Sequence, residues 1–180
     1  MTTPDLDALN AASPEAASAA LAPLFEGAPL FLARLVARRP FGDWAALFAT
    51  AREIAHGMPE AEQVELVDAH PRLGAPPGTV SAMSFREQGY DRDPAPELAA
   101  APAGSGSPGD APAALDRLNA AYEARFGFRY CVFVAGRPRE ALLPEMAASL
   151  AADRASELHR ALDAVVDIAA ARLEQATASR

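Results

Sequence analysis

Apolar residues recur every three or four positions along most of the chain, a spacing that places them on one face of an α-helix. The clearest stripe follows Asp43 and consists of Trp44, Leu47, Phe48, Ala51 and Ile54. Comparable patterns predict helices at about 28–38, 112–126, 138–151 and 154–175. The pattern therefore predicts an all-α fold, a multi-helix bundle in a single domain that spans residues 1–180.

Residues that favour helix ends indicate where several of these helices begin and stop. The side chains of Asp5, Ser13 and Asp43 are of the kind that accepts hydrogen bonds from the first backbone N–H groups of a helix. Proline follows Ser13 at the first helical position, and Pro59 starts a further helix. Because Pro71 biases the residue before it towards extended geometry, we expect that helix to stop at His70.

Two segments break the helical pattern. Residues 91–112 are rich in proline, glycine and alanine and show no periodicity, which predicts a flexible internal loop. Residues 128–134 form a short apolar run around Cys131. A strand, a buried extended segment and a distorted helix are all compatible with this run.

The composition of the chain argues against several kinds of binding partner. The chain has 180 residues, of which 51% are hydrophobic, and a formal net charge of −8, which argues against nucleic acid or an anionic membrane surface. Its one cysteine excludes an internal disulfide, and with no H-E-x-x-H pattern we expect no metal site. Without a basic and apolar leader or a long apolar run, we expect a cytoplasmic protein.

Two neighbouring segments hold the main candidates for chemistry, Ala-His-Pro-Arg-Leu-Gly at 69–74 and Ser-Phe-Arg-Glu-Gln at 84–88. An imidazole that titrates near neutral pH, a hydroxyl, a carboxylate and an amide suit a small polar ligand. Both segments also have structural explanations. His70 would interact favourably with a helix C-terminus, Ser84 and Glu87 fit a capping box, and Gln88 would then be an exposed helix residue.

Arg172 stands out by its position in the last predicted helix. It continues the helical spacing of an apolar stripe formed by Leu158, Leu162, Val165 and Ala169. One interpretation is an arginine whose stem covers the edge of the core while its charge reaches solvent. The other is a guanidinium directed into a cleft to hold a carboxylate.

Taken in order, these segments resemble the OHCU decarboxylase family, whose substrate is 2-oxo-4-hydroxy-4-carboxy-5-ureidoimidazoline (OHCU). The resemblance rests on residues 69–74 and 84–88, on Leu-Asn-Ala-Ala-Tyr-Glu-Ala-Arg-Phe-Gly-Phe at 118–128, and on Ala-Arg-Leu at 171–173. It extends over nearly the whole chain, from Arg39-Pro40-Phe41 to Arg172.

The resemblance implies an all-α fold, usually a homodimer, that needs no cofactor and converts OHCU to (S)-allantoin in urate breakdown. It implies His70 as the catalytic residue. The substrate-binding residues that it implies are Pro71, Ser84, Glu87, Gln88, Phe126, Gly127, Phe128 and Arg172. The expected partner is therefore a small molecule, with neither nucleic acid nor a membrane.

The chain also departs from the family pattern, which leaves one alternative open, and a second alternative comes from the structural explanations given above. Many members have aspartate after His-Pro, where this chain has Arg72, and the segment 73–84 is shorter here. One alternative is a family member that acts on a related imidazoline. The other is a helical interaction protein without catalytic activity, in which these segments serve only as helix ends.

Overall fold

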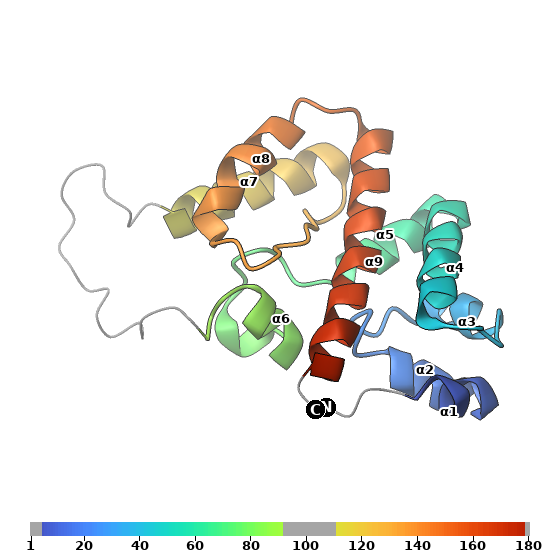
Figure 1. The fold of residues 1–180 in the computed structure, drawn as a ribbon. Helices are drawn as coiled ribbons and strands as arrows, with labels where there is room; N and C mark the ends of the chain where they lie inside the picture. Colours follow the sequence, from blue (N-terminus) through green and yellow to red (C-terminus); the bar gives the residue numbers. More distant parts are fainter. Residues whose placement is uncertain (1–4, 92–110, 179–180) are drawn as a thin grey trace. The chain divides into compact units, whose positions relative to one another are not determined.

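Helices account for all the regular secondary structure in the computed structural model, which describes residues 5–91 and 111–178. Figure 1 shows them in chain order. The α-helices are α1 (Leu6–Ala11), α2 (Pro14–Leu21), α3 (Pro29–Val36), α4 (Trp44–Gly57), α5 (Glu60–Asp68), α6 (Ala82–Glu87), α7 (Ala111–Phe126), α8 (Leu143–Ser149) and α9 (Arg154–Ala178). Two shorter 3-10 turns are η1 (Pro77–Thr79) and η4 (Arg139–Leu142). The all-α class predicted from the apolar spacing is confirmed.

The predicted helix starts at Asp5, Ser13 and Asp43 are also confirmed. In each case the side-chain oxygen accepts a hydrogen bond from the backbone N–H three residues later. Caps of this kind stabilise a helix by about 1 kcal/mol. Pro59 immediately precedes α5, and α5 ends at Asp68, two residues before His70. These local signals position the histidine just beyond a helix end.

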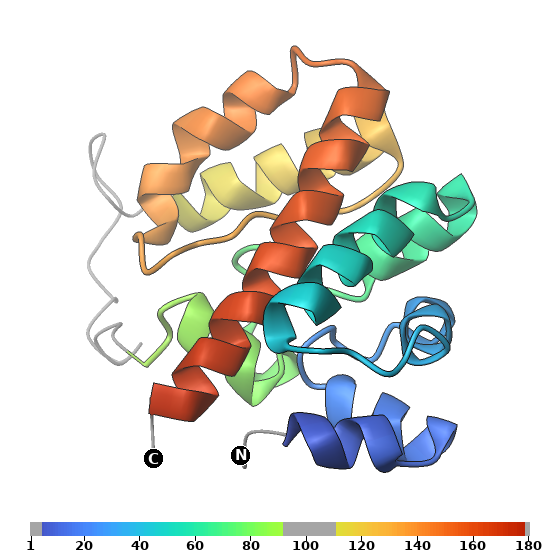
Figure 2. The same ribbon diagram turned by 45° about the vertical axis from the view of Figure 1, so that its right-hand side comes forward.

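The described residues divide into two units, between which the chain passes more than once. Unit 1 comprises residues 5–70, 131–133 and 153–178, and so contains α1 to α5 and α9. Within it, α4 and α5 lie against α9 (Figure 2). The predicted stripe of α9 is buried, because its four apolar members are at most 3% exposed. Burial of each large apolar side chain contributes roughly 1.5–3 kcal/mol.

Unit 2 comprises residues 71–91, 111–130 and 134–152, with α7 packed against α8. An aromatic cluster forms much of its core. The Tyr122 ring centroid lies 4.5 Å from that of Phe126, 5.7 Å from that of Phe128 and 5.1 Å from that of Tyr130. The rings are tilted or edge-to-face, arrangements that add to the stabilisation from burial alone.

The C-terminal half departs from the predicted elements in two places. The helix expected at 138–151 is instead the tight turn η4 followed by the shorter α8. Pro144, in the first turn of α8, has no N–H to donate, so a continuous helix through it would lose a hydrogen bond. Residues 129–134 have no regular secondary structure, which makes the strand and helix alternatives wrong, although Tyr130, Cys131 and Val134 are buried. Apart from its ends, the predicted loop at 91–112 lies outside the described residues.

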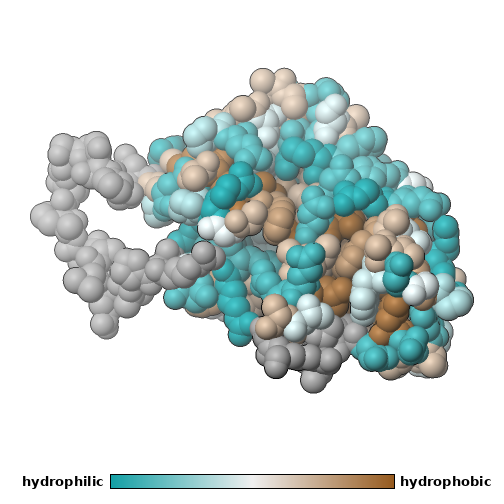
Figure 3. All heavy atoms as spheres, viewed as in Figure 1, coloured by the Kyte–Doolittle hydropathy of each residue, from teal (hydrophilic) through white to brown (hydrophobic). Residues whose placement is uncertain are grey.

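The face shown in Figure 3 is covered mostly by polar residues, with smaller apolar areas between them. This agrees with the net charge of −8. No helix in the described part of the chain combines the length and the apolar character needed to cross a membrane.

Candidate functional site

His70, the last residue of unit 1 before the chain enters unit 2, is buried. Its backbone N–H donates to the Val67 carbonyl oxygen, and its Nδ1 lies 3.4 Å from the Leu66 carbonyl oxygen. The helix end therefore brings the imidazole against the backbone of α5. Its side chain is only 4% exposed, so its protonation state depends on the protein rather than on solvent.

The pKa of His70 is lowered to about 4. Burial is the main cause, because it disfavours the charged imidazolium, and the positive charge of Arg172 lowers the pKa further. The negative charge of Glu26 and the hydrogen bond with Leu66 act in the opposite direction. The imidazole is consequently neutral at pH 7, and it does not have the near-neutral pKa expected from the sequence.

Arg172 is completely buried, so the interpretation in which its charge reaches solvent is wrong. Its Nη1 donates to the carbonyl oxygens of Pro23 (2.9 Å) and Leu24 (3.2 Å), and its Nη2 donates to Glu26 Oε1 at 2.7 Å. The guanidinium does hold a carboxylate, but this carboxylate belongs to the protein. Because a buried charge without a partner is very costly, this ion pair is what allows Arg172 to lie in the interior.

Glu26 is a member of this cluster that the sequence interpretation missed. It lies in the loop between α2 and α3, and its backbone is in the left-handed region, with φ of +51°. Only glycine adopts that region freely, so the ion pair with Arg172 helps to offset a local backbone cost. A charged residue directly after the apolar pair Leu24-Phe25 is the signal that could have identified it.

In unit 2, the side chains of three residues, Gln88, Tyr90 and Asn119, form hydrogen bonds with the backbone of the loop that follows His70. Gln88 Oε1 accepts from the Gly74 N–H (2.7 Å), and Gln88 Nε2 donates to the Arg72 carbonyl oxygen (3.1 Å). Asn119 Nδ2 donates to the Leu73 carbonyl oxygen (2.9 Å), and the Tyr90 hydroxyl donates to the Ala75 carbonyl oxygen. The backbone directly after the His-Pro pair is therefore held at four consecutive residues.

Asn119 is the second residue that the sequence interpretation missed. It is 2% exposed and shares the buried face of α7 with Leu115, Tyr122 and Phe126. A polar residue at helical spacing within an otherwise apolar stripe is a detectable signal. Its partner at Leu73 is 46 residues away in sequence, which no local pattern reveals.

Gly74 explains why the His-Pro segment ends in glycine. Its φ is +81°, and a Cβ at this position would collide with the Leu115 side chain. The left-handed backbone therefore strains any larger residue, and the Leu115 side chain of α7 would have to shift to make room for it. Arg72 points elsewhere and forms a two-point ion pair with Glu123 of α7, which gives this departure from the family pattern a partner within unit 2.

The short helix α6 contains Ser84 in its first turn and Glu87 as its last residue, and Gln88 is its C-cap. Its N-cap is Ser81, whose Oγ accepts from the Ser84 N–H (3.1 Å). The capping-box interpretation of Ser84 and Glu87 is wrong, because the helix begins three residues earlier. Ser84 is buried inside the helix, Glu87 is its half-buried last residue, and Gln88 is buried rather than exposed.

Phe126, Gly127 and Phe128 form the turn that ends α7. The φ of Gly127 is +77°, and its N–H donates to the Glu123 carbonyl oxygen at 2.9 Å, a common way to close a helix C-terminus. The reversal brings Phe128 back onto Tyr122. Both phenylalanines are buried, whereas Gly127 is exposed. Pro71 is half-buried at the start of unit 2.

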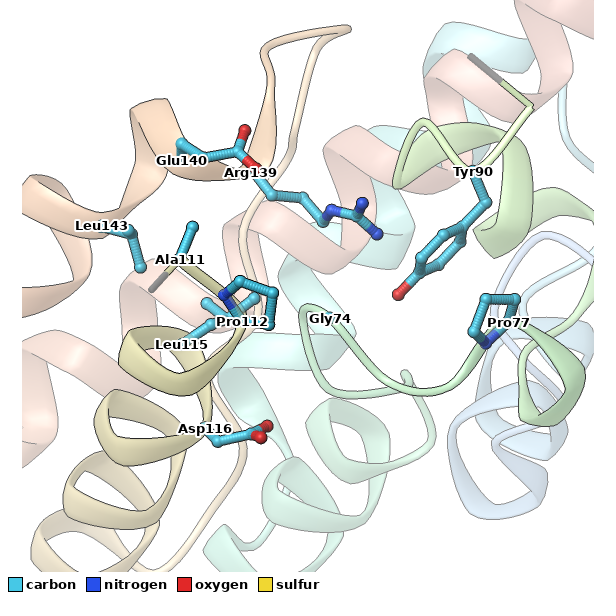
Figure 4. Close-up of a pocket in the computed structure, with 10 residues that line it drawn as sticks. All are labelled: Gly74, Pro77, Tyr90, Ala111, Pro112, Leu115, Asp116, Arg139, Glu140 and Leu143. Carbon is cyan, nitrogen blue, oxygen red and sulfur yellow. The ribbon is translucent and has the colours of Figure 1, made fainter. Parts of the chain in front are cut away.

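A cavity of about 220 Å³ in unit 2 contains none of these predicted residues. Figure 4 shows its lining, in which the Arg139 guanidinium extends towards the Tyr90 ring. The guanidinium carbon lies 4.2 Å from the ring centroid, which is a cation–π contact. The floor is apolar and includes Leu115 and Leu143. This cavity is a feature separate from the predicted site residues.

Other charged side chains gather between α4 and α9 in unit 1. Arg52 donates to Asp163 (2.6 Å) and to Asp167 (2.7 Å), and His56 Nε2 lies 2.8 Å from Asp163. In the described ranges, no group of three or more histidine, cysteine, aspartate or glutamate residues is arranged to hold a metal ion. This network links the two helices.

Comparisons with known proteins support one family. A family model described as OHCU decarboxylase matches residues 10–174. The 2-oxo-4-hydroxy-4-carboxy-5-ureidoimidazoline decarboxylase of Amia calva is 28% identical over 170 residues, which cover 94% of this chain and 93% of that protein. The uric acid degradation bifunctional protein PucL of Bacillus subtilis is 29% identical over 176 residues, which cover 93% of this chain and 32% of that protein.

The fold is also similar to that of a crystal structure of OHCU decarboxylase in the presence of (S)-allantoin. The TM-score is 0.63 at 19% sequence identity, with 91% of this chain and 97% of that chain covered. The family model spans His70, the segment 84–88, the turn at 126–128 and Arg172. The chain therefore belongs to the OHCU decarboxylase family.

Proposed function

We propose that this protein is a cofactor-independent decarboxylase that converts OHCU to (S)-allantoin in urate degradation. The observation that carries the proposal is the group formed by buried His70, buried Arg172 and half-buried Glu26, in which a neutral imidazole lies in the field of a fixed guanidinium. Family membership supports the same reaction. Buried titratable groups with a strongly shifted pKa and a defined charged partner are typical of functional sites.

The substrate contains its own electron sink, which removes the need for a cofactor. Its carboxylate is attached to a carbon that also carries a hydroxyl and adjoins a C=N bond. When the bond to the carboxylate breaks and CO2 leaves, the electron pair forms a C=C bond to the carbon of that C=N bond, and the ring nitrogen takes up a proton. The hydroxyl then loses its proton to become a carbonyl, and a proton is added to one face of the carbon that carries the ureido group.

His70 suits the proton transfer from the hydroxyl. A neutral imidazole can accept a proton, and the lowered pKa keeps it neutral at pH 7. The same shift makes it a weaker base than an unperturbed histidine, so its contribution depends on close contact with the hydroxyl. In this proposal His70 hydrogen-bonds the hydroxyl and takes its proton as CO2 leaves. Arg172 pairs with the substrate's anionic oxygen, since a guanidinium binds carboxylates through directed hydrogen bonds.

The remaining roles concern recognition of the neutral groups of the substrate. Glu87 accepts hydrogen bonds from ring or ureido N–H groups. Gln88 has both a donor and an acceptor, which suits a substrate whose N–H and C=O groups alternate. In this proposal Ser84 and Pro71 also contact the substrate, and the turn from Phe126 to Phe128 provides backbone contacts. A site of this kind orients the ring so that only one face is protonated.

The test uses the optical activity of the product. OHCU decays spontaneously to racemic allantoin, so freshly generated OHCU is mixed with the full chain and followed by circular dichroism. The proposal predicts faster loss of OHCU and a final signal from (S)-allantoin alone. A racemic product formed at the rate of the buffer control would contradict it and would favour a helical interaction protein. Slow turnover of OHCU beside fast turnover of another imidazoline would instead indicate a changed substrate.

A further inference from the structure

Glu26 lies where it can control how strongly Arg172 attracts an anion. Its carboxylate is 2.7 Å from Arg172 Nη2, and the Glu26 side chain is 13% exposed while that of Arg172 is fully buried. Two loop carbonyls, of Pro23 and Leu24, also accept from the same guanidinium. Arg172 is thus held by three residues of a single short loop between α2 and α3.

We propose that Glu26 is a positioning residue of the decarboxylation site, which fixes the Arg172 guanidinium and balances its charge so that the substrate carboxylate is held only moderately. This inference rests on the proposed function, because it assigns Arg172 to the substrate carboxylate. The backbone conformation of Glu26 supports its assignment as a positioning residue. A glutamate keeps a left-handed φ of +51° here, a conformation that persists only where the surrounding contacts compensate for it.

The charge balance matters because decarboxylation removes the group that Arg172 binds. A guanidinium without a counter-ion would stabilise the carboxylate of the bound substrate more than the transition state, in which that charge is leaving. Interactions that favour the ground state lower KM and also lower kcat. With Glu26 beside it, Arg172 can orient the carboxylate without holding the substrate in its unreacted form.

The central variant is Glu26→Gln, which removes the charge and keeps an oxygen that can accept from Arg172. We expect KM for OHCU to fall about fivefold and kcat to fall about tenfold, the pattern of a more tightly bound ground state. Wild-type values of both constants would overturn the proposal. An increase in KM with unchanged kcat would also overturn it, since that result describes simple loss of binding.

A matched control is Glu62→Gln. Glu62 also pairs with an arginine of unit 1, Arg34, at 2.6 Å, but this pair lies on the surface. The control should leave KM and kcat unchanged. If it reproduced the Glu26→Gln pattern, the effect would come from lost ion pairing in general, and the proposal would be wrong.

A second pair of variants tests the same proposal if Glu26→Gln does not fold. Asn and Asp both tolerate left-handed backbone better than glutamine, and they differ from each other only in charge. We expect Glu26→Asp to retain a kcat close to that of the wild type and Glu26→Asn to show the low-KM, low-kcat pattern. Equal constants for the two variants would overturn the proposal. A wild-type chain that leaves OHCU decay racemic would contradict the proposed function itself, which separates the two failures.

Discussion

The candidate residues of unit 1 and those of unit 2 are held by different forces. In unit 1, His70 and Arg172 are buried and Glu26 is half-buried, and the charges of Arg172 and Glu26 act on each other and on the pKa of His70. In unit 2, Gln88 and Asn119 hold the loop after Pro71 by neutral hydrogen bonds, and the turn around Gly127 is held by aromatic packing. Charges in a low-dielectric interior act strongly and depend on pH, whereas neutral hydrogen bonds mainly fix geometry.

This difference indicates that the two groups of residues suit different tasks. The electrostatic group of unit 1 has the properties needed for proton transfer and for attraction of an anion. The hydrogen-bonded loop and helix end of unit 2 have the properties needed for recognition of a polar ring by shape. Variants of the two groups should therefore differ in the size and the kind of their effects.

The largest effect is expected for Arg172→Ala. This change leaves Glu26 partly buried without its cation, and removal of one partner from a buried ion pair costs about 3–5 kcal/mol. The free energy of unfolding, measured with urea, should fall by that amount. The double variant Arg172→Ala with Glu26→Gln should regain part of it. A single variant with the wild-type urea midpoint would show that the pair contributes nothing to the fold.

Gly74→Ala tests the loop of unit 2 in the same assay. The added Cβ meets Leu115 and needs a left-handed backbone, so we expect a loss of about 2 kcal/mol or more. Gly78→Ala is the matched control, because a Cβ at Gly78 meets nothing within 4 Å. Equal stability of the two variants would mean that the close approach of α7 does not constrain this loop.

An intermediate effect is expected from pH. Because the pKa of His70 is about 4 in the folded chain and the pKa of an unperturbed histidine is about 6.5, the unfolded chain binds more protons than the folded chain between these values. The contribution of His70 to stability is therefore complete above pH 6.5 and is lost as pH falls towards 4. The urea midpoint of the wild type should decrease more over this range than that of His70→Asn. Parallel curves would contradict a buried neutral imidazole.

The smallest effects on stability are expected at the end of α6. Gln88→Ala removes two hydrogen bonds to the loop backbone and should cost about 1–2 kcal/mol. Glu87→Ala changes a half-buried helix end, and we expect a smaller change in stability but weaker binding of OHCU. Gln88→Ala should therefore lower both stability and binding of OHCU, whereas Glu87→Ala should mainly lower binding. Normal binding by Glu87→Ala would remove Glu87 from the site.

Features set by local chemistry could be predicted from the sequence. The helix starts at Asp5, Ser13 and Asp43 depend only on a side chain and the backbone three residues later. The position of Arg172 on the apolar face of α9 follows from helical spacing, but that spacing left open whether its charge reaches solvent. The start of α6 was misplaced because Ser81 and Ser84 are both suitable caps, and only the path of the chain decides between them.

Features that depend on tertiary contacts could not be predicted in this way. The partner of Arg172 is 146 residues away at Glu26, and no periodicity connects them. The depth of His70, and with it the lowered pKa, likewise depends on packing around the end of α5. The family resemblance identified the residues, but the charges that surround His70 became visible only in the structure.

The most direct test of the central claim compares His70→Asn with the wild type on freshly generated OHCU. Asparagine keeps a hydrogen-bonding side chain but cannot accept the proton, and loss of a general base typically lowers the rate by about a hundredfold or more. His159→Asn, at an exposed position of α9, is the control. We predict that only the His70 variant loses the rapid formation of (S)-allantoin seen by circular dichroism. Formation of (S)-allantoin by His70→Asn at the wild-type rate would contradict the role of His70 as the base.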